Sequence, residues 1–215
     1  MNSKLLLVMA IFVASAMVIM AESSRSQKTT HHQELTETNL KIIKRSEWNA
    51  AKPIDKSPLN SSVPYVIVHH SASPPACYTR LACQNALRSM QRTHQLVNGW
   101  DDIGYNFLIG ADDDGDGEIY EGRGFGVKGA HAPGYNYRSI GICLIGNWSE
   151  SVPPQGMLDK MKQLINYGVE KGHIQRNYRL HGHRQVKATE CPGKALQAEI
   201  EKWEHFRRAS RATKR

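Results

Sequence analysis

The segment VPYVIVHH, residues 63–70, constrains the fold of this chain more than any other stretch. Its β-branched apolar residues and its short length are typical of a buried strand. Pro64 lies near its start and the turn-forming sequence SASPP follows it, so the strand is expected to end at His69 and His70. A buried strand needs other strands to pair with and further elements to cover it, and the rest of the sequence supplies both.

Strand and helix patterns alternate along the remainder of the chain. Three more strands are predicted in GYNFLIG (104–110), GEIYEG (117–122) and SIGICLIG (139–146), with glycine-rich turns between them. The spacing of apolar residues predicts three helices, which cover residues 79–97, residues 151–172 and a segment after Pro192. We therefore expect a single α/β domain with a central mixed sheet flanked by about three helices.

The 215-residue chain fits one domain with residues to spare. At its N-terminus Lys4 precedes an apolar run from Leu5 to Met20, which is typical of a secretory signal peptide over residues 1–21. The run is shorter than the roughly 20 apolar residues that span a bilayer, so we expect no membrane span and a secreted, extracellular protein. The predicted order is then a flexible leader (22–40), the domain (41–206) and a basic tail (207–215).

The charge distribution argues against nucleic-acid binding. The formal net charge is +8, but the tail at 207–215 contributes five basic residues and no acidic residue. The domain before it is only mildly basic, whereas a nucleic-acid-binding protein concentrates positive charge on its fold. The tail is therefore interpreted as a solvated end of the chain.

The four cysteines differ in their sequence surroundings. Cys77 and Cys83 lie six residues apart across CYTRLAC, close enough for a small-loop disulfide at a helix start. Cys143 lies inside the apolar run IGICLIG and is expected to be a buried thiol. Cys191 is left without a disulfide partner, near histidines, where a metal ion would hold it as thiolate. In a secreted chain two sequons also become glycosylation candidates, at Asn60 and Asn147.

The segment LHGHRQVKATECPG contains the polar residues of a metal site. His183 and Cys191 lie eight residues apart, so a loop can bring them to one centre, and a third ligand must come from elsewhere. The end of the predicted strand offers His69 or His70, because a strand end is a rigid platform for a ligand. Two imidazoles and one thiolate suit Zn²⁺, and three protein ligands leave a fourth position for water, as in catalytic sites. The HExxH pattern of helix-borne metalloproteases is absent.

Five motifs together resemble the peptidoglycan recognition proteins, which share their domain with zinc-dependent N-acetylmuramoyl-L-alanine amidases. They are VIVHHSAS, DIGYNFLIG, EGRGFGVKGAHAPGYN, SIGICLIGNW and LHGHRQVKATECPG, in the family's order, and the resemblance runs from about Ile42 to Phe206. Within the family the chain is most similar to the secreted, catalytic LB-type proteins of insects. The resemblance implies the amidase type 2 fold and hydrolysis of the bond between N-acetylmuramic acid and L-alanine, which degrades an elicitor of innate immunity.

The same resemblance implies roles for individual residues. It selects His69, together with His183 and Cys191, as the zinc ligands. Family members that only bind peptidoglycan typically have serine at the position of Cys191, so the cysteine favours an enzyme. Tyr105 matches the tyrosine whose hydroxyl faces the metal, and Thr189 matches a polar residue that orients water or substrate.

Further positions match residues that bind the substrate. The substrate-binding positions are His94, Gly99, Trp100, Arg123, His131 and Asn136. Arginine at position 123 can bind a carboxylate with two hydrogen bonds, and with Gly99-Trp100 it resembles family members that prefer the meso-diaminopimelic acid stem. The expected partners are bacterial peptidoglycan and muropeptides, and the protein is expected to be a monomer.

Two alternatives belong to other functional classes. Residues 112–123 (DDDGDGEIYEGR) match the start of a calcium-binding loop, but Arg123 stands where the bidentate glutamate is required, which favours a polar hairpin. A non-catalytic immune receptor would bind peptidoglycan in the same site without cutting it. Cys191 is the residue that distinguishes an enzyme from such a receptor.

Overall fold

A computed structural model describes residues 40–112 and 114–208 of the chain. The predicted signal peptide, nearly all of the predicted leader and most of the basic tail lie outside the described residues. Among the described residues, no helix has the length and apolar character needed to cross a membrane.

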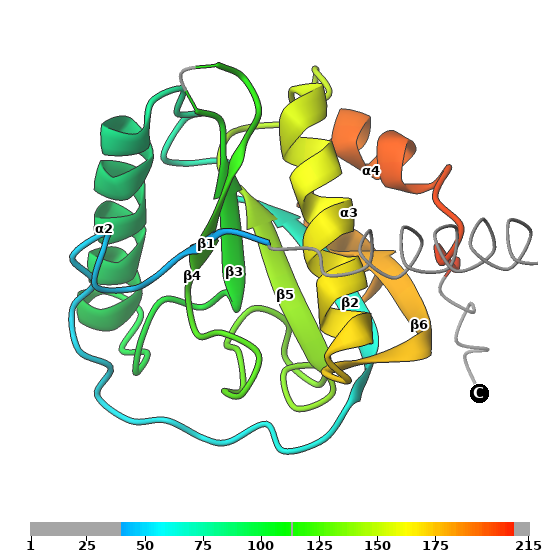
Figure 1. Cartoon of the computed structure of the whole chain (residues 1–215), viewed down its shortest axis with the longest axis horizontal. Helices are drawn as coiled ribbons and strands as arrows, with labels where there is room; N and C mark the ends of the chain where they lie inside the picture. The colour runs from blue at the N-terminus through cyan, green and yellow to red at the C-terminus, as the bar shows by residue number, and fades with distance from the viewer. Residues whose placement is uncertain (1–39, 113, 209–215) are drawn as a thin grey trace, which may run out of the picture. The chain divides into compact units, whose positions relative to one another are not determined.

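Six strands form one mixed sheet in the order β1-β4-β3-β5-β2-β6 (Figure 1). β2 pairs in parallel with both β5 and β6, and β3 pairs in parallel with β5. β4 runs antiparallel to β3, and the short β1 pairs in parallel with β4. The strands are β1 (Ile42–Ile43), β2 (Val63–His70), β3 (Phe107–Gly110), β4 (Glu118–Glu121), β5 (Ser139–Leu144) and β6 (Ile174–Gly182).

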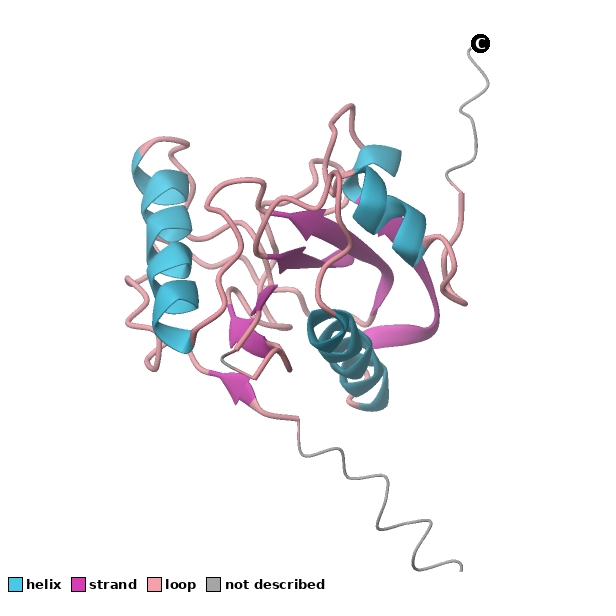
Figure 2. Ribbon diagram, turned by 90° about the horizontal axis from the view of Figure 1, so that it is seen from above, coloured by secondary structure: helices cyan, strands magenta, loops and turns pink. Residues whose placement is uncertain are grey.

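Three α-helices flank the sheet, as predicted. α2 (Arg80–Leu96) lies on one face of the sheet, and α3 (Gln155–Glu170) and α4 (Lys194–Ile200) lie on the other (Figure 2). The side chain of Thr79 accepts a hydrogen bond from the backbone N–H of Ala82 and so caps the start of α2. A short 3₁₀-helix, η1 (His183–Gln185), follows β6. The α/β architecture with a central mixed sheet is therefore confirmed.

Each face of the sheet has its own apolar cluster. Val66 and Val68 of β2 pack with α3 in the larger cluster. The smaller cluster joins Leu87 and Met90 of α2 to β3, β4 and β5, and it includes no residue of β2 or β6. Because side chains alternate along a strand, His69 lies on the face opposite Val66 and Val68. On this face α2 packs over β3, β4 and β5, so the residues of the candidate site gather beside it.

Sequence patterns did not predict β6, the nine-residue strand at one edge of the sheet. Its exposed residues Arg176, Asn177 and Arg179 interrupt the apolar pattern, because an edge strand has a partner on one side only. Pairing with β2 defines it as a strand and sets its last residue, Gly182, opposite Val68, so that His183 follows beside the end of β2.

Candidate metal centre

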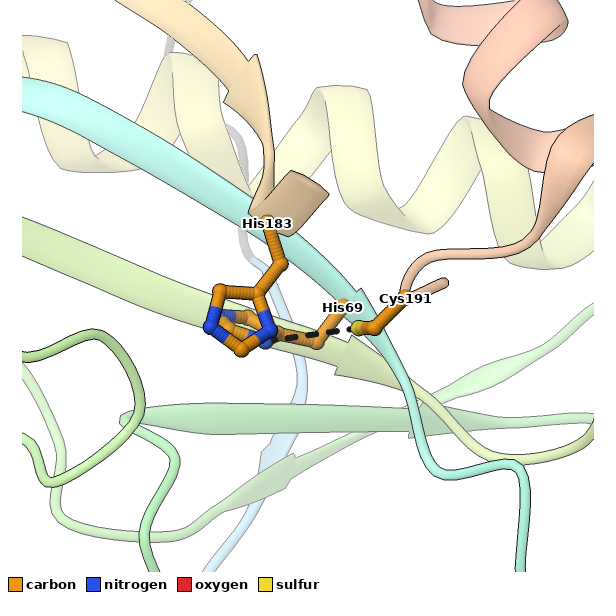
Figure 3. Close-up of side chains that lie close together, drawn as sticks. All are labelled: His69, His183 and Cys191. Atoms are coloured by element: carbon orange, nitrogen blue, oxygen red, sulfur yellow. Dashed lines mark hydrogen bonds between the residues drawn. The ribbon is translucent and has the colours of Figure 1, made fainter. Parts of the chain in front are cut away.

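Three of the predicted ligands converge from separate segments (Figure 3). His69 comes from the end of β2, His183 from η1 immediately after β6, and Cys191 from the loop that precedes α4. Since β2 and β6 are parallel neighbours, their carboxyl ends meet at the same edge of the sheet. One ligand atom from each residue lies within 4.8 Å of the ligand atoms of the other two. His70, the other histidine considered from the sequence, is not part of this group.

Hydrogen bonds fix Cys191 relative to the end of β2. The Nδ1 atom of His69 lies 3.6 Å from Cys191 Sγ. The backbone N–H of His70 donates to the same sulfur at 3.4 Å, which favours a negative charge on it. Thr189 Oγ1 accepts from the backbone N–H of Cys191 at 3.2 Å, so the threonine holds the loop that carries the thiol.

Burial sets the protonation states of these side chains. It lowers the pKa of His69 well below its ordinary value, and the neighbouring His131 lowers that pKa further. Burial likewise lowers the pKa of His183 to about 4, so both imidazoles are neutral near pH 7 and offer lone pairs. Burial raises the pKa of the Cys191 thiol to about 12, and only a bound cation would make the thiolate the stable form near neutrality.

The donor set fits a zinc ion. Two neutral imidazoles and one thiol are the ligand types that zinc prefers, and their spacing allows them to share one ion. The Nε2 atom of His183 is buried and has no hydrogen-bond partner among the described residues. A buried polar atom without a partner is unfavourable, so this atom is one that a ligand of the site or a water molecule would satisfy.

A row of aromatic rings leads from the metal-binding residues to the Gly99-Trp100 segment. The ring centroids of His183 and His69 are 4.4 Å apart, and those of His69 and Tyr105 are 5.2 Å apart. His94 follows at 5.8 Å from Tyr105, and Trp100 lies 4.7 Å beyond His94. The rings of the predicted zinc ligands and of three predicted substrate or catalytic residues are therefore contiguous.

Tyr105 is half-buried within this row. Burial raises the pKa of its hydroxyl well above the ordinary value, and the neighbouring Cys143 and Cys191 raise it further. The hydroxyl therefore keeps its proton at neutral pH and can donate a hydrogen bond.

Arg123 is largely occupied by backbone acceptors. Its side chain is buried, and Nε donates to the carbonyl of Ile103 at 2.7 Å. Nη1 donates to Lys128 and Nη2 to Asp102, at 3.0 and 3.3 Å. A guanidinium has five N–H groups, so three of them hold the protein's own loops and one N–H group remains on each terminal nitrogen.

His131 and Asn136 were predicted to contact substrate, and the structure places both in internal contacts. His131 is 5% exposed, and its Nδ1 atom lies 3.0 Å from Nε2 of His69. Asn136 Oδ1 accepts from the backbone N–H groups of His131 and Ala132, at 2.9 and 2.8 Å, and so holds the turn between them.

The remaining predicted residues are not part of the metal-binding group. Cys77 and Cys83 form the expected disulfide at the start of α2, and Cys143 is a buried thiol. Asn60 and Asn147, the residues of the two sequons, are both exposed.

Asp102 is a residue near the site that sequence reasoning missed. It is 3% exposed, and its carboxylate accepts from Arg45, from Gln91 Nε2 at 2.7 Å and from the backbone N–H of Ile103 at 2.8 Å. These bonds fix the segment that connects Trp100 to Tyr105. The sequence gives only an acidic residue before an apolar one, which is not a distinctive signal.

Comparison with known proteins identifies the family. A family model described as N-acetylmuramoyl-L-alanine amidase matches residues 59–194. Peptidoglycan-recognition protein LB of Drosophila melanogaster is 52% identical over 166 residues, which cover 77% of this chain and 70% of that protein. The chain belongs to the peptidoglycan recognition proteins, within the N-acetylmuramoyl-L-alanine amidase family. The family predicted from the sequence motifs is thus confirmed.

Solved structures of similar peptidoglycan recognition proteins include complexes with a ligand. A variant of Drosophila PGRP-LB in complex with tracheal cytotoxin is 51% identical, with a TM-score of 0.74, and the match covers 77% of this chain and 96% of that one. Peptidoglycan recognition protein LE is 43% identical, also with a TM-score of 0.74, over 78% of this chain and 96% of that one. Its ligand is tracheal cytotoxin, described as monomeric diaminopimelic acid-type peptidoglycan.

Proposed function

We propose that this protein is a secreted, monomeric, zinc-dependent N-acetylmuramoyl-L-alanine amidase that acts on peptidoglycan of the diaminopimelic acid type. It would cut the amide between N-acetylmuramic acid and L-alanine and so degrade an elicitor of innate immunity. The observation that carries the proposal is the convergence of His69, His183 and Cys191 from three segments, with ligand atoms within 4.8 Å of one another. Serine is typical at the position of Cys191 in relatives that only bind, and the thiol present here favours catalysis.

The metal-binding residues would hold zinc through one nitrogen of each histidine and the sulfur of Cys191. When bound, zinc supplies Lewis-acid chemistry, which activates water and polarises an amide carbonyl near pH 7. Three protein ligands leave room for the substrate or water that a closed structural site excludes.

Tyr105 would stabilise the negative charge that develops on the carbonyl oxygen of the scissile amide. Its hydroxyl is protonated at neutral pH and its ring lies beside that of His69, so the O–H group can donate to this oxygen. Thr189 uses its oxygen lone pair to accept from the backbone of Cys191, which leaves its own hydroxyl proton to orient water or substrate.

The stem peptide would extend along the row of rings toward Trp100. His94 and Trp100 offer ring faces, and the two remaining N–H groups of Arg123 match the second carboxylate of diaminopimelic acid, which lysine lacks. The complexes of two relatives with tracheal cytotoxin support this choice of stem.

Mass spectrometry of digested muropeptides tests the proposal. Purified zinc-loaded protein is incubated with diaminopimelic acid-type and lysine-type muropeptides, with and without a chelator. We expect release of free stem peptide, faster from the diaminopimelic acid type, and no release when the chelator is present. If the zinc-loaded protein binds both muropeptides and releases no stem peptide, it is a receptor and not an amidase.

Two cysteine variants show whether the metal-binding group is responsible for cleavage. Cys191→Ser is expected to abolish cleavage and retain some binding. Cys143→Ala changes the other thiol, which neighbours Tyr105 but is not part of the metal-binding group, and is expected to keep the zinc affinity of the wild type and at least part of its cleavage. Unchanged cleavage by Cys191→Ser would remove this site from the mechanism.

A further inference from the structure

The two ring nitrogens of His69 face different surroundings. Nδ1 lies toward Cys191, at 3.6 Å from its sulfur, and therefore toward the candidate zinc position. Nε2 lies 3.0 Å from Nδ1 of His131, on the protein side of the ring. The two imidazole planes meet at 83°, so the edge of one ring approaches the other.

The hydrogen-bond partners determine where the protons lie. A metal ligand must offer a lone pair, so Nδ1 of His69 carries no proton and Nε2 carries the single proton of the neutral ring. Nε2 then donates to Nδ1 of His131, which must accept. The proton of His131 is therefore on its Nε2, which lies 3.5 Å from Ser139 Oγ, the longest link of the series.

Ser139 completes the series. Its hydroxyl donates to the backbone carbonyl of Tyr135 at 2.8 Å, which leaves the oxygen lone pairs for His131. Every donor from His69 to Tyr135 thus has an acceptor, and the series ends on a carbonyl that can only accept. If every hydrogen bond of the series ran in the opposite direction, the carbonyl of Tyr135 would lose its donor and the proton of His69 would lie on Nδ1, the ligand atom.

The ring of His131 has little freedom to move. A Cβ atom added at Gly141 would lie 2.4 Å from both Cγ and Cδ2 of His131, and one added at Gly129 would lie 2.4 Å from Cδ2. Only glycine at both positions leaves room for the ring. Gly141 belongs to β5 and pairs with Ile67, two residues before His69, so the register of β2 and β5 aligns the two histidines.

We propose that His131 is a positioning residue: it accepts the Nε2 proton of His69 and so fixes the tautomer and orientation in which His69 Nδ1 can hold the metal ion. This proposal rests on the proposed function only in taking His69 as a zinc ligand. Outer hydrogen-bond partners of this kind raise the basicity of the ligand and orient its ring. The role differs from substrate contact, which the resemblance implied for this residue.

A matched pair of variants separates the hydrogen bond from packing. Asparagine and leucine have similar shapes, but the Oδ1 atom of asparagine accepts a hydrogen bond near the position of His131 Nδ1 and leucine accepts none. We expect His131→Leu to raise the dissociation constant for zinc by about 10- to 100-fold, and His131→Asn to stay within about threefold of the wild type. Competition with a chromogenic chelator measures zinc affinity, and thermal melting of the zinc-free proteins verifies that both variants fold.

The outcomes are decisive in both directions. Loss of zinc affinity in the leucine variant alone supports the proposal. Equal loss in both folded variants would mean that packing of the ring matters and its acceptor does not, and unchanged affinity in the leucine variant would remove His131 from the site altogether. Either result overturns the proposal.

Nitrogen-15 NMR of the zinc-free wild type gives a reading that does not depend on metal or on cleavage. We expect His69 to be the Nε2–H tautomer, and a proton on Nδ1 would contradict the series. A wild type that binds zinc, shows this tautomer and cuts no muropeptide would refute the amidase function and leave the role of His131 standing.

Discussion

Removing the carboxylate of Asp102 is expected to destabilise the fold by an amount that its hydrogen bonds predict. In Asp102→Ala two buried donors lose their acceptor, the backbone N–H of Ile103 and one N–H of Gln91. Each buried unsatisfied donor costs about 1–3 kcal/mol, and loss of one partner of a buried ion pair costs about 3–5 kcal/mol. Arg45 is 21% exposed and keeps its hydrogen bonds to the backbone carbonyls of Gly122 and Ala51, so its guanidinium adds little further cost. The two donors together give a total of about 2–6 kcal/mol.

Asp102→Asn tests how that cost is divided between the hydrogen bonds of the side chain and its charge. The amide oxygen still accepts from Gln91 and Ile103, but the charge is lost and the amide nitrogen replaces Oδ2, the acceptor of Arg45 Nη1, so we expect about 1–2 kcal/mol. Lys202→Ala is the control, since Lys202 is 70% exposed in its pair with Glu199 and should cost less than about 1 kcal/mol.

Urea unfolding of the zinc-free proteins, analysed with a common slope, measures these three free energies. If Asp102→Asn costs as much as Asp102→Ala, the charge dominates and the reasoning from hydrogen bonds is wrong. A cost below about 1 kcal/mol for Asp102→Ala would show that this carboxylate does not anchor the segment between Trp100 and Tyr105.

Three further predictions concern the site and its surroundings. Tyr105→Phe should lower kcat by about 100-fold and leave zinc affinity unchanged, since only the donor to the developing oxyanion is lost. Steady-state kinetics and a zinc titration measure both quantities, and an unchanged kcat or a weakened zinc affinity would contradict the prediction. Replacing Cys77 and Cys83 by serine opens a small loop and should lower the free energy of unfolding by about 2 kcal/mol, measured by urea unfolding. Burial lowers the pKa of His94 from 6.5 to about 4, so the unfolded state binds the proton first, and stability fully present above pH 6.5 is lost as the pH falls toward 4. His94→Gln should therefore reduce the loss of stability between pH 7 and pH 5 in the zinc-free protein, and an unchanged loss would contradict this.

The metal-binding group could be predicted because its chemistry is distinctive in the sequence. A histidine at the end of an apolar strand, and a histidine and cysteine eight residues apart near Pro192, carry a signal that does not depend on long-range packing. The choice between His69 and His70 as the ligand rests on a different kind of signal. Alternation along β2 decides it, because the face that holds Val66 and Val68 packs against α3 and directs His69 to the opposite side.

Roles that depend on strand pairing could not be predicted from the sequence. β6 looks polar because three of its nine residues are exposed at the sheet edge, and its partner β2 lies about a hundred residues away in the chain. His131 is 62 residues from His69, and only the register that sets Gly141 opposite Ile67 brings the two rings together. A histidine in a glycine-rich loop gives the same sequence signal whether it faces substrate or supports a metal ligand.

The site depends on the rest of the fold through His69. This residue is the one member of the metal-binding group that a central strand carries, with β5 and β6 on either side, and its ring contacts Tyr105, His131 and His183. Cys191, by contrast, belongs to a loop and reaches the site through bonds to the backbone of His70. A central strand deviates little in position, so it defines where the metal ion can lie, and the loop then adapts to that position. For this reason we expect the side chains around His69, more than those around Cys191, to determine the affinity for zinc.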